Sequence, residues 1–399
     1  MSKFIVLVPD GMADEPVDML GGKTPLEAAH TPWMDQLVKK GISGLVQTIP
    51  DNYPPGSDIG NLALMGYDPA QCFTGRAPLE AANMNIILAA NEMAFRCNVV
   101  TSFDGNMTDY SAGHISSEEA AILIKDLDKA LGSSTIRFYP GKSYRHLMVL
   151  TTDEIEGFSK VNTKPPHDIL NQPIEGFLPQ GTHAKVLLTL MEKSKTVFAN
   201  HPVNQARMAK GLLPVTMIWL WGQGKKPQLP LLKDKFGITG SVISAVDLVN
   251  GIGRLAGLAV IDVPGANGYY DTNYVGKVEY ALTSLKQHDF VYIHIEAPDE
   301  AGHNGDAKAK KECIEKIDAL VVKRLIDFMT TNSDVRLLIS PDHPTPVAKR
   351  THTRSAVPFV MAGQGIVTNG LTALGETQAQ HKGVLFDSGA ALLTAFFKK

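Results

Sequence analysis

The stretch that decides the fold is FIVLVPDG, residues 4–11. Its five consecutive apolar residues, Phe4 to Val8, show no polar alternation and end at Asp10. A run of this kind is typical of a strand covered on both faces, as in a parallel sheet. Similar apolar runs occur at residues 196–200, 215–222, 290–299, 336–343 and 358–363.

The segments between these runs have helical spacing. The clearest is KECIEKIDALVVKRLIDFM, residues 311–329. One face of this helix would carry Ile314, Ile317, Leu320, Val321, Leu325 and Phe328. Strands that alternate with helices predict an α/β fold, with a mostly parallel sheet sandwiched by helices.

The middle of the chain has a different character. Residues 98–116 have the pattern of a strand, a tight turn and a loop, and residues 161–184 are rich in Pro, Gly and Asn. Long polar loops of this kind are typical of an added functional domain. We therefore expect a smaller α/β cap domain inserted into the main one. The expected ranges are 1–74 and 215–399 for the main domain and 75–214 for the cap.

Composition excludes several classes of protein. The net charge is −3 and the basic residues are scattered, so neither nucleic acid nor an acidic membrane is an expected partner. The three cysteines, Cys72, Cys97 and Cys313, lie far apart and form no thiolate zinc motif. No apolar segment is long enough to span a bilayer. The sequence predicts a cytoplasmic protein in a reducing compartment and leaves its oligomeric state open.

Three of the predicted strands are followed by an acidic residue. These residues are Asp10, Asp299 and Asp342. One such acid is usually a turn former or a helix cap. Ligand sites in open α/β sheets form beyond the carboxyl ends of the strands, so we expect these three carboxylates to converge.

Histidines accompany two of these acids. His303 follows Asp299 by four residues, which places both on one face of a helical turn. His343 follows Asp342 directly, and the flanking prolines break the strand, so both side chains can reach one ion. His352 can fold back from the next loop. Carboxylates and imidazoles without thiolates suit two divalent ions such as Mn, Zn or Mg.

A candidate nucleophile lies in YPPGSDIGNLALMGYDP, residues 53–69. Two neighbouring metal ions favour phosphoryl transfer. Ser57 lies at the predicted start of a helix, where free N–H groups attract phosphate, and a metal would lower the pKa of its hydroxyl. Without the acid and histidine cluster, Ser57 would be read as a simple helix cap.

The order of these motifs resembles the alkaline phosphatase superfamily, and more closely the cofactor-independent phosphoglycerate mutases of the archaeal type. The motifs are Asp10, the Ser57 segment, DEAGH (299–303), SPDH (340–343) and THT (351–353). Segments 24–35, 75–81, 95–101, 144–149 and 262–269 add to the match. The resemblance implies one ion held by Asp299, His303 and His352, and another by Asp10, Asp342, His343 and Ser57.

The resemblance also implies a reaction. Ser57 would take the phosphoryl group of 3-phosphoglycerate, and the 2-hydroxyl of the retained glycerate would take it back, in glycolysis and gluconeogenesis. The cap would exclude water. The cofactors implied are two divalent ions, manganese ahead of magnesium, zinc or cobalt, and no 2,3-bisphosphoglycerate. Candidate substrate contacts in the cap are Arg96, Asp109, His114, Arg145 and His146, with His167 and Asp168 nearby, and about half of these should make only local loop contacts.

Two other kinds of function stay open. The same site could phosphorylate homoserine or hydrolyse phosphomonoesters. A non-catalytic metal-binding protein could keep the ligands as structural groups. The last is disfavoured because a structural site seldom needs a serine at a helix N-terminus.

Overall fold

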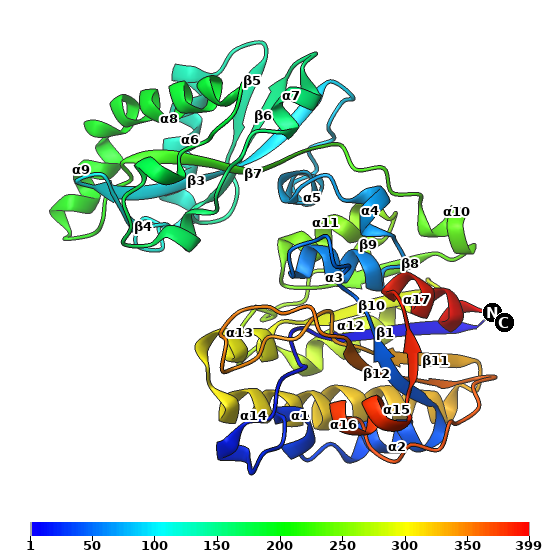
Figure 1. The fold of residues 1–399 in the computed structure, drawn as a ribbon. Helices are drawn as coiled ribbons and strands as arrows, with labels where there is room; N and C mark the ends of the chain where they lie inside the picture. Colours follow the sequence, from blue (N-terminus) through cyan, green and yellow to red (C-terminus); the bar gives the residue numbers. More distant parts are fainter. Residues whose placement is uncertain (1, 399) are drawn as a thin grey trace. The chain divides into compact units, whose positions relative to one another are not determined.

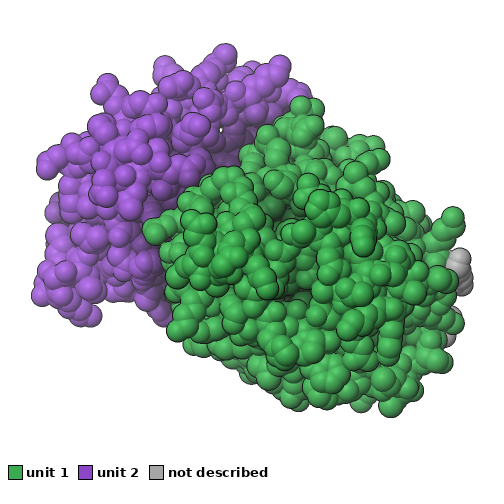
Figure 2. All heavy atoms as spheres, turned by 60° about the horizontal axis from the view of Figure 1, so that its bottom comes forward, with its two compact units in different colours: residues 1–73, 228–399 green, residues 74–227 purple. Residues whose placement is uncertain are grey.

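The computed structural model describes residues 2–398 and divides the chain into two compact units. The first unit contains residues 1–73 and 228–399, and the second contains residues 74–227 (Figure 2). Among the described residues, no helix combines the length and apolarity required to cross a membrane.

The first unit is built on an eight-stranded sheet (Figure 1). The strands are β1 (Lys3–Pro9), β2 (Ile42–Val46), β8 (Gly240–Ile243), β9 (Ala259–Val260), β10 (Phe290–Ile295), β11 (Val335–Ile339), β12 (Val357–Gly363) and β13 (Val384–Phe386). Their order is β13-β2-β12-β11-β1-β10-β8-β9. β12 is antiparallel to both neighbours and all other pairs are parallel, so the prediction of a mostly parallel sheet is confirmed.

Helices cover both faces of this sheet (Figure 1). One face carries α2 (Pro32–Lys40), α12 (Tyr274–Ser284), α14 (Ala307–Ile317) and α15 (Lys323–Thr331), and the other carries α3 (Ser57–Leu64), α11 (Asp247–Leu255) and α17 (Gly389–Phe397). Successive residues of β1 serve opposite faces. Ile5 and Leu7 join the core beneath α12 and α14, whereas the ring of Phe4 lies 5.7 Å from that of Phe396 in α17.

The remaining helices of this unit are short. They are α1 (Pro25–Ala28), α4 (Pro69–Cys72), α10 (Leu232–Phe236), α13 (Ala297–Asn304) and α16 (Glu376–Lys382), with a single turn at Asp18–Leu20. The helix predicted over residues 311–329 is present as α14 and α15, joined by a π-helical turn at Asp318–Val322.

The second unit has its own antiparallel five-stranded sheet and its own core. Its strands are β3 (Glu92–Phe103), β4 (Asn106–Asp109), β5 (Ile136–Tyr139), β6 (Arg145–Thr151) and β7 (Met217–Lys225). Its helices are α5 (Arg76–Asn83), α6 (Ser117–Leu131), α7 (Ile155–Ser159), α8 (Ala184–Ala199) and α9 (Pro202–Ala209), with short turns at Pro166–Ile169 and Glu175–Phe177. Phe95, Phe198 and Trp219 are fully buried at the centre of this core.

Two predictions about this unit are wrong. The run at 215–222 was expected in the main sheet, but it forms β7 and pairs antiparallel with β3, so the unit ends at residue 227 rather than 214. An apolar run shows that a strand is buried, not which sheet it joins. The run at 196–200 was expected to be a strand, but it is the end of α8, whose buried residues Leu187, Leu190 and Met191 repeat with helical spacing.

The two ends of the second unit lie together. The Thr74 hydroxyl donates a hydrogen bond to the Lys225 carbonyl oxygen at 2.5 Å. A Cβ atom at Gly224 would lie 2.4 Å from the Thr74 carbonyl oxygen, so this close approach requires glycine.

Candidate metal centre

The candidate site lies where three neighbouring strands of the first unit end. β1 pairs with β10 on one side and with β11 on the other. Asp10 follows β1, and Asp342 and His343 lie in the loop after β11. α13 begins directly after β10 and carries Asp299 and His303. The parallel topology therefore brings together side chains that are hundreds of residues apart in the chain.

Three side chains form one half of the site. The Nε2 atom of His303 lies 3.3 Å from Asp299 Oδ2, and the Nε2 atom of His352 lies 3.5 Å from Asp299 Oδ1. The two Nε2 atoms are 2.9 Å apart. The Arg350 carbonyl oxygen lies 3.1 Å from His303 Nδ1 and accepts its proton, so Nε2 is the ring nitrogen that faces the other groups.

Four side chains form the other half. The Nε2 atom of His343 lies 3.1 Å from Ser57 Oγ and 3.4 Å from oxygens of both Asp10 and Asp342. Ser57 is the first residue of α3, close to the predicted start of this helix. Asp342 and His343 lie beyond the end of β11, so their adjacent side chains are not forced to opposite faces as they would be in a strand.

These residues fit divalent cations chemically. Burial, followed by repulsion from Asp342 and Glu296, raises the pKa of Asp10 well above its ordinary value. Asp10 Oδ1 is buried without a hydrogen-bond partner in the described part of the chain. Ligand atoms of Asp299, His343 and His352 lie within 4.8 Å of one another, as do those of Asp10, His294 and Asp342. A cation would compensate such crowded buried charges.

Comparisons with known proteins show the family to which the chain belongs. Residues 38–204 match the family described as 2,3-bisphosphoglycerate-independent phosphoglycerate mutase. A protein from Geobacter sulfurreducens, named probable 2,3-bisphosphoglycerate-independent phosphoglycerate mutase, is 48% identical to this chain over 396 residues, with 98% of each chain covered. The mutase from Methanothrix thermoacetophila is 49% identical over 382 residues, with 96% of each chain covered. The chain belongs to the 2,3-bisphosphoglycerate-independent phosphoglycerate mutases.

Solved structures support the fold of this family member. The PH0037 protein from Pyrococcus horikoshii has a TM-score of 0.82 and 28% identity, with 99% of this chain and 96% of that chain covered. The cofactor-independent phosphoglycerate mutase from Thermoplasma acidophilum has a TM-score of 0.67 and 24% identity, with 99% of both chains covered. The resemblance to archaeal-type mutases is confirmed by the relatives named above, at 48% and 49% identity.

Sequence reasoning missed a histidine that holds Asp10 in this mutase. His294 lies in β10, and its Nε2 is 2.7 Å from Asp10 Oδ2, while its Nδ1 is 3.1 Å from the Ser244 hydroxyl. Burial lowers the pKa of His294 to about 3, so the ring is neutral, and its Nε2 atom shares one hydrogen bond with Asp10. A polar residue inside an otherwise apolar strand was the signal that could have revealed it.

A second missed residue holds Asp342. The side-chain amide of Asn61 donates to Asp342 Oδ2 at 2.7 Å, and the Tyr292 hydroxyl donates to Asn61 Oδ1 at 2.7 Å. Asn61 lies one turn after Ser57 in α3. Gly60 allows this approach, because a Cβ atom there would lie 2.4 Å from the Asp342 carbonyl oxygen. An asparagine among the apolar residues of this helix was the signal in the sequence, and the structure shows it fully buried.

The arginines proposed to contact substrate lie in the second unit of this mutase. Arg96 is buried in β3, where its Nε lies 3.0 Å from Glu80 Oε2 and its guanidinium lies 4.2 Å from the Trp221 ring centre. Burial, together with the nearby charges of Arg76 and Arg145, lowers the pKa of Arg96 to about 10. Arg145 Nε is buried and has no hydrogen-bond partner among residues 2–398.

The other predicted substrate contacts have local roles or lie on turns. Asp109 accepts hydrogen bonds from the N–H and the hydroxyl of Ser111, both at 2.7 Å. His146 is 1% exposed, its Nδ1 accepts the Gly141 N–H at 2.9 Å, and burial lowers its pKa to about 3. His114 is exposed in a left-handed turn with φ 51°. The geometry thus favours a structural role for Asp109, whereas the Nε2 atom of His146 is buried without a hydrogen-bond partner among the described residues.

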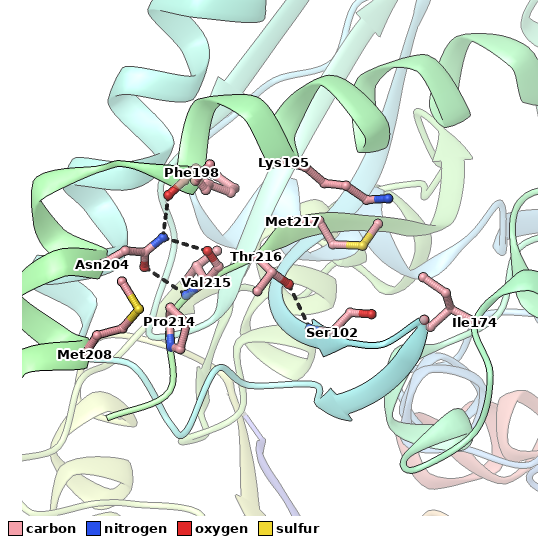
Figure 3. A pocket seen from close by; sticks show the side chains of 12 residues that line it. Ser102, Ile174, Lys195, Phe198, Asn204, Met208, Pro214, Val215, Thr216 and Met217 are labelled. Atoms are coloured by element: carbon pink, nitrogen blue, oxygen red, sulfur yellow. Dashed lines mark hydrogen bonds between the residues drawn. The ribbon is translucent and has the colours of Figure 1, made fainter. Parts of the chain in front are cut away.

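The second unit also has a pocket of about 360 Å³ (Figure 3). Phe198, Val215, Met217 and Lys195 are among the residues that line it. The Asn204 side chain donates to the carbonyl oxygens of Phe198 and Val215 and accepts the Val215 N–H. None of the predicted site residues lines this pocket. The buried side-chain amide of Asn204 already uses both N–H groups and its oxygen in hydrogen bonds within the protein.

Proposed function

We propose that the chain interconverts 3-phosphoglycerate and 2-phosphoglycerate through a phosphoserine at Ser57. The observation that carries this proposal is the position of Ser57 Oγ, 3.1 Å from His343 Nε2, at the first residue of α3. Family membership supports the reaction, because the relatives are named for it. The helix N-terminus adds positive potential where the transferred phosphoryl group would lie.

We propose that seven residues hold two divalent cations. Asp299, His303 and His352 would hold one, and Asp10, Asp342, His343 and Ser57 the other. When bound, the cations neutralise phosphoryl oxygens and lower the pKa of the serine hydroxyl. His294 and Asn61 keep the carboxylates of Asp10 and Asp342 oriented. Manganese is the proposed metal, because carboxylate oxygens suit it and neither ligand set contains a thiolate.

Activity on defined substrates tests the reaction. Manganese-loaded protein is incubated with 3-phosphoglycerate, and the products are followed by phosphorus NMR. We expect 2-phosphoglycerate without release of free phosphate. Free phosphate in its place would identify a phosphomonoesterase, and phosphohomoserine formed on addition of homoserine would identify a different acceptor.

Replacement of the nucleophile tests the mechanism. Ser57→Ala is expected to abolish turnover while most of both metals remains bound, because the other proposed ligands stay in place. Ser117→Ala is a matched control, since Ser117 is also the first residue of a helix, α6. Full activity of Ser57→Ala would contradict the phosphoserine route.

We further propose that Arg96 and Arg145 bind anionic groups of the substrate. The buried Nε atom of Arg145 has no hydrogen-bond partner in the described part of the chain, and such a guanidinium donor suits a carboxylate or a phosphate. Arg145→Ala is expected to raise KM for 3-phosphoglycerate by about tenfold, the effect of losing one charged hydrogen bond. Arg137→Ala is the control, because Arg137 is exposed and pairs with Asp128. An unchanged KM for Arg145→Ala removes that residue from the substrate site.

A further inference from the structure

One threonine contacts residues from both halves of the metal centre. Thr345 follows Asp342 and His343 in the loop after β11 and is fully buried. Its Oγ1 lies 2.5 Å from Asp299 Oδ1 and 3.2 Å from His343 Nδ1. Asp299 and His343 are proposed ligands of different cations, so this hydroxyl bridges the two ligand sets.

Hydrogen-bond chemistry fixes the direction of this bridge. The threonine hydroxyl has one proton, and a carboxylate oxygen only accepts. Thr345 therefore donates to Asp299, and the Nδ1–H of His343 donates to Thr345. The Nε2 atom of His343 then carries a lone pair and no proton, and it faces Ser57 Oγ at 3.1 Å. A metal-binding histidine needs this tautomer.

The surrounding backbone holds the threonine in place. Its N–H donates to the Ala13 carbonyl at 3.2 Å, and its carbonyl accepts the Lys310 amine at 2.9 Å. Two glycines lie against it. A Cβ atom at Gly11 would lie 2.6 Å from Thr345 Oγ1, and one at Gly302 would lie 2.3 Å from the Thr345 carbonyl oxygen. Little room exists for the hydroxyl to turn away from its two partners.

We propose that Thr345 is a positioning residue that couples the two cation sites. Through the bonds from His343 to Thr345 and from Thr345 to Asp299, a cation that orders one ligand set also orders a ligand of the other. The inference rests on the two-cation arrangement proposed above. The competing explanation is a threonine that only packs the loop, in which case its methyl group and not its hydroxyl would matter.

Metal binding by two variants separates these explanations. Thr345→Val keeps the shape and removes the hydroxyl, whereas Thr345→Ser keeps the hydroxyl and removes the methyl group. Metal-free protein is titrated with manganese by calorimetry, and with cobalt by visible absorption, which reports ligand geometry. We expect Thr345→Val to weaken the binding of both cations by about tenfold or more, the usual effect of losing a group that orients a ligand. Its cobalt spectrum should also change.

The controls define which results overturn the inference. Thr345→Ser should bind both cations with an affinity within about threefold of that of the original protein, because serine keeps the hydroxyl that makes both hydrogen bonds. Thr394→Val, an exposed position on α17, should change nothing. The inference is overturned if Thr345→Val weakens one cation only or neither, or if Thr345→Ser is as impaired as Thr345→Val.

Two further measurements keep the outcome clear. Circular dichroism of the metal-free variants tests folding, and Thr345→Ala replaces Thr345→Val in the same comparison if the latter does not fold. An original protein that takes up fewer than two manganese ions would refute the two-cation proposal itself. Two ions bound by the original protein and equally well by Thr345→Val would refute only the coupling.

Discussion

His352 shows how one residue can be assigned to one cation. Its Nε2 lies near Asp299 and His303 but it comes from a loop that starts at the other half-site. We expect His352→Ala to lose one of two manganese ions after dialysis, as measured by elemental analysis, because the second ligand set is intact. His381→Ala, at an exposed position, is the control. Retention of both ions would contradict the assignment, and the coupling proposed through Thr345 predicts that the remaining ion is bound more weakly than in the original protein.

Glu376 gives a residue-level prediction for pH. It is half-buried and accepts hydrogen bonds from the Thr24 hydroxyl at 2.7 Å and the Asp14 N–H at 3.1 Å. Burial raises its pKa from 4.5 to about 7. The folded chain then binds this proton more tightly than the unfolded chain, so the free energy of unfolding falls as pH rises through this window.

The variant Glu376→Gln stays neutral at every pH. In the original protein, the free energy of unfolding should fall by about 3 kcal/mol as pH rises from the ordinary pKa of Glu376 to its raised pKa. We expect no such fall in Glu376→Gln. Urea unfolding of the metal-free protein near the two ends of the window measures the difference. Glu312→Gln, at an exposed site, should retain the original slope. An identical slope for Glu376→Gln would show that Glu376 is ionised throughout.

Residues at strand ends were accessible to sequence reasoning, but their supporting groups were not. Asp10, Asp299 and Asp342 could be placed together because parallel strands end at one edge. Asn61 and His294 could not be placed, because they lie inside a helix and a strand, where no strand-end rule indicates which carboxylate a polar side chain contacts. Only the folded structure shows which buried polar group faces which carboxylate.

At the scale of elements, Lys310 ties α14 to two loops of the metal centre. Its amine contacts the Asp14 carboxylate at 2.7 Å and the carbonyl oxygens of Ala13 and Thr345. The side chains of Lys310 and Asp14 are both almost fully buried. We expect Lys310→Met to lower the free energy of unfolding by about 3–5 kcal/mol, because Asp14 would keep a buried charge without its partner.

A neighbouring lysine is the matched control for this experiment. Lys311 pairs with Glu315 at 2.8 Å near the surface, so Lys311→Met should cost less than about 1 kcal/mol in urea unfolding. Adding Asp14→Asn to Lys310→Met should restore part of the stability. Equal effects of the two lysine variants would mean that the buried pair does not stabilise the fold.

Elements were predictable as strands more readily than as members of a particular sheet. β1, β10 and β11 were expected correctly from their apolar runs. β12 is antiparallel to its neighbours and β7 belongs to the second sheet, although their sequences look the same as those of the parallel strands. Strand direction and partner depend on the connections, which periodicity does not report.

At the scale of the whole molecule, the second unit has what an independent domain requires. It has its own sheet, its own core around Trp219, and ends held together by Thr74 and Lys225. We expect residues 74–227, expressed alone, to fold cooperatively, as measured by circular dichroism and thermal unfolding. Trp219→Ala in this fragment should abolish the transition or lower its midpoint strongly. A fragment without a cooperative transition would contradict the prediction.

The joined ends of the second unit have a consequence for how this chain can change. An insertion that enters and leaves at one point can be exchanged without opening the host sheet, because the host strands keep their order whatever is inserted. A relative with another substrate could thus arise by replacement of the whole second unit. The hydrogen bond from Thr74 to Lys225 marks the two positions at which one such unit should be exchanged for another.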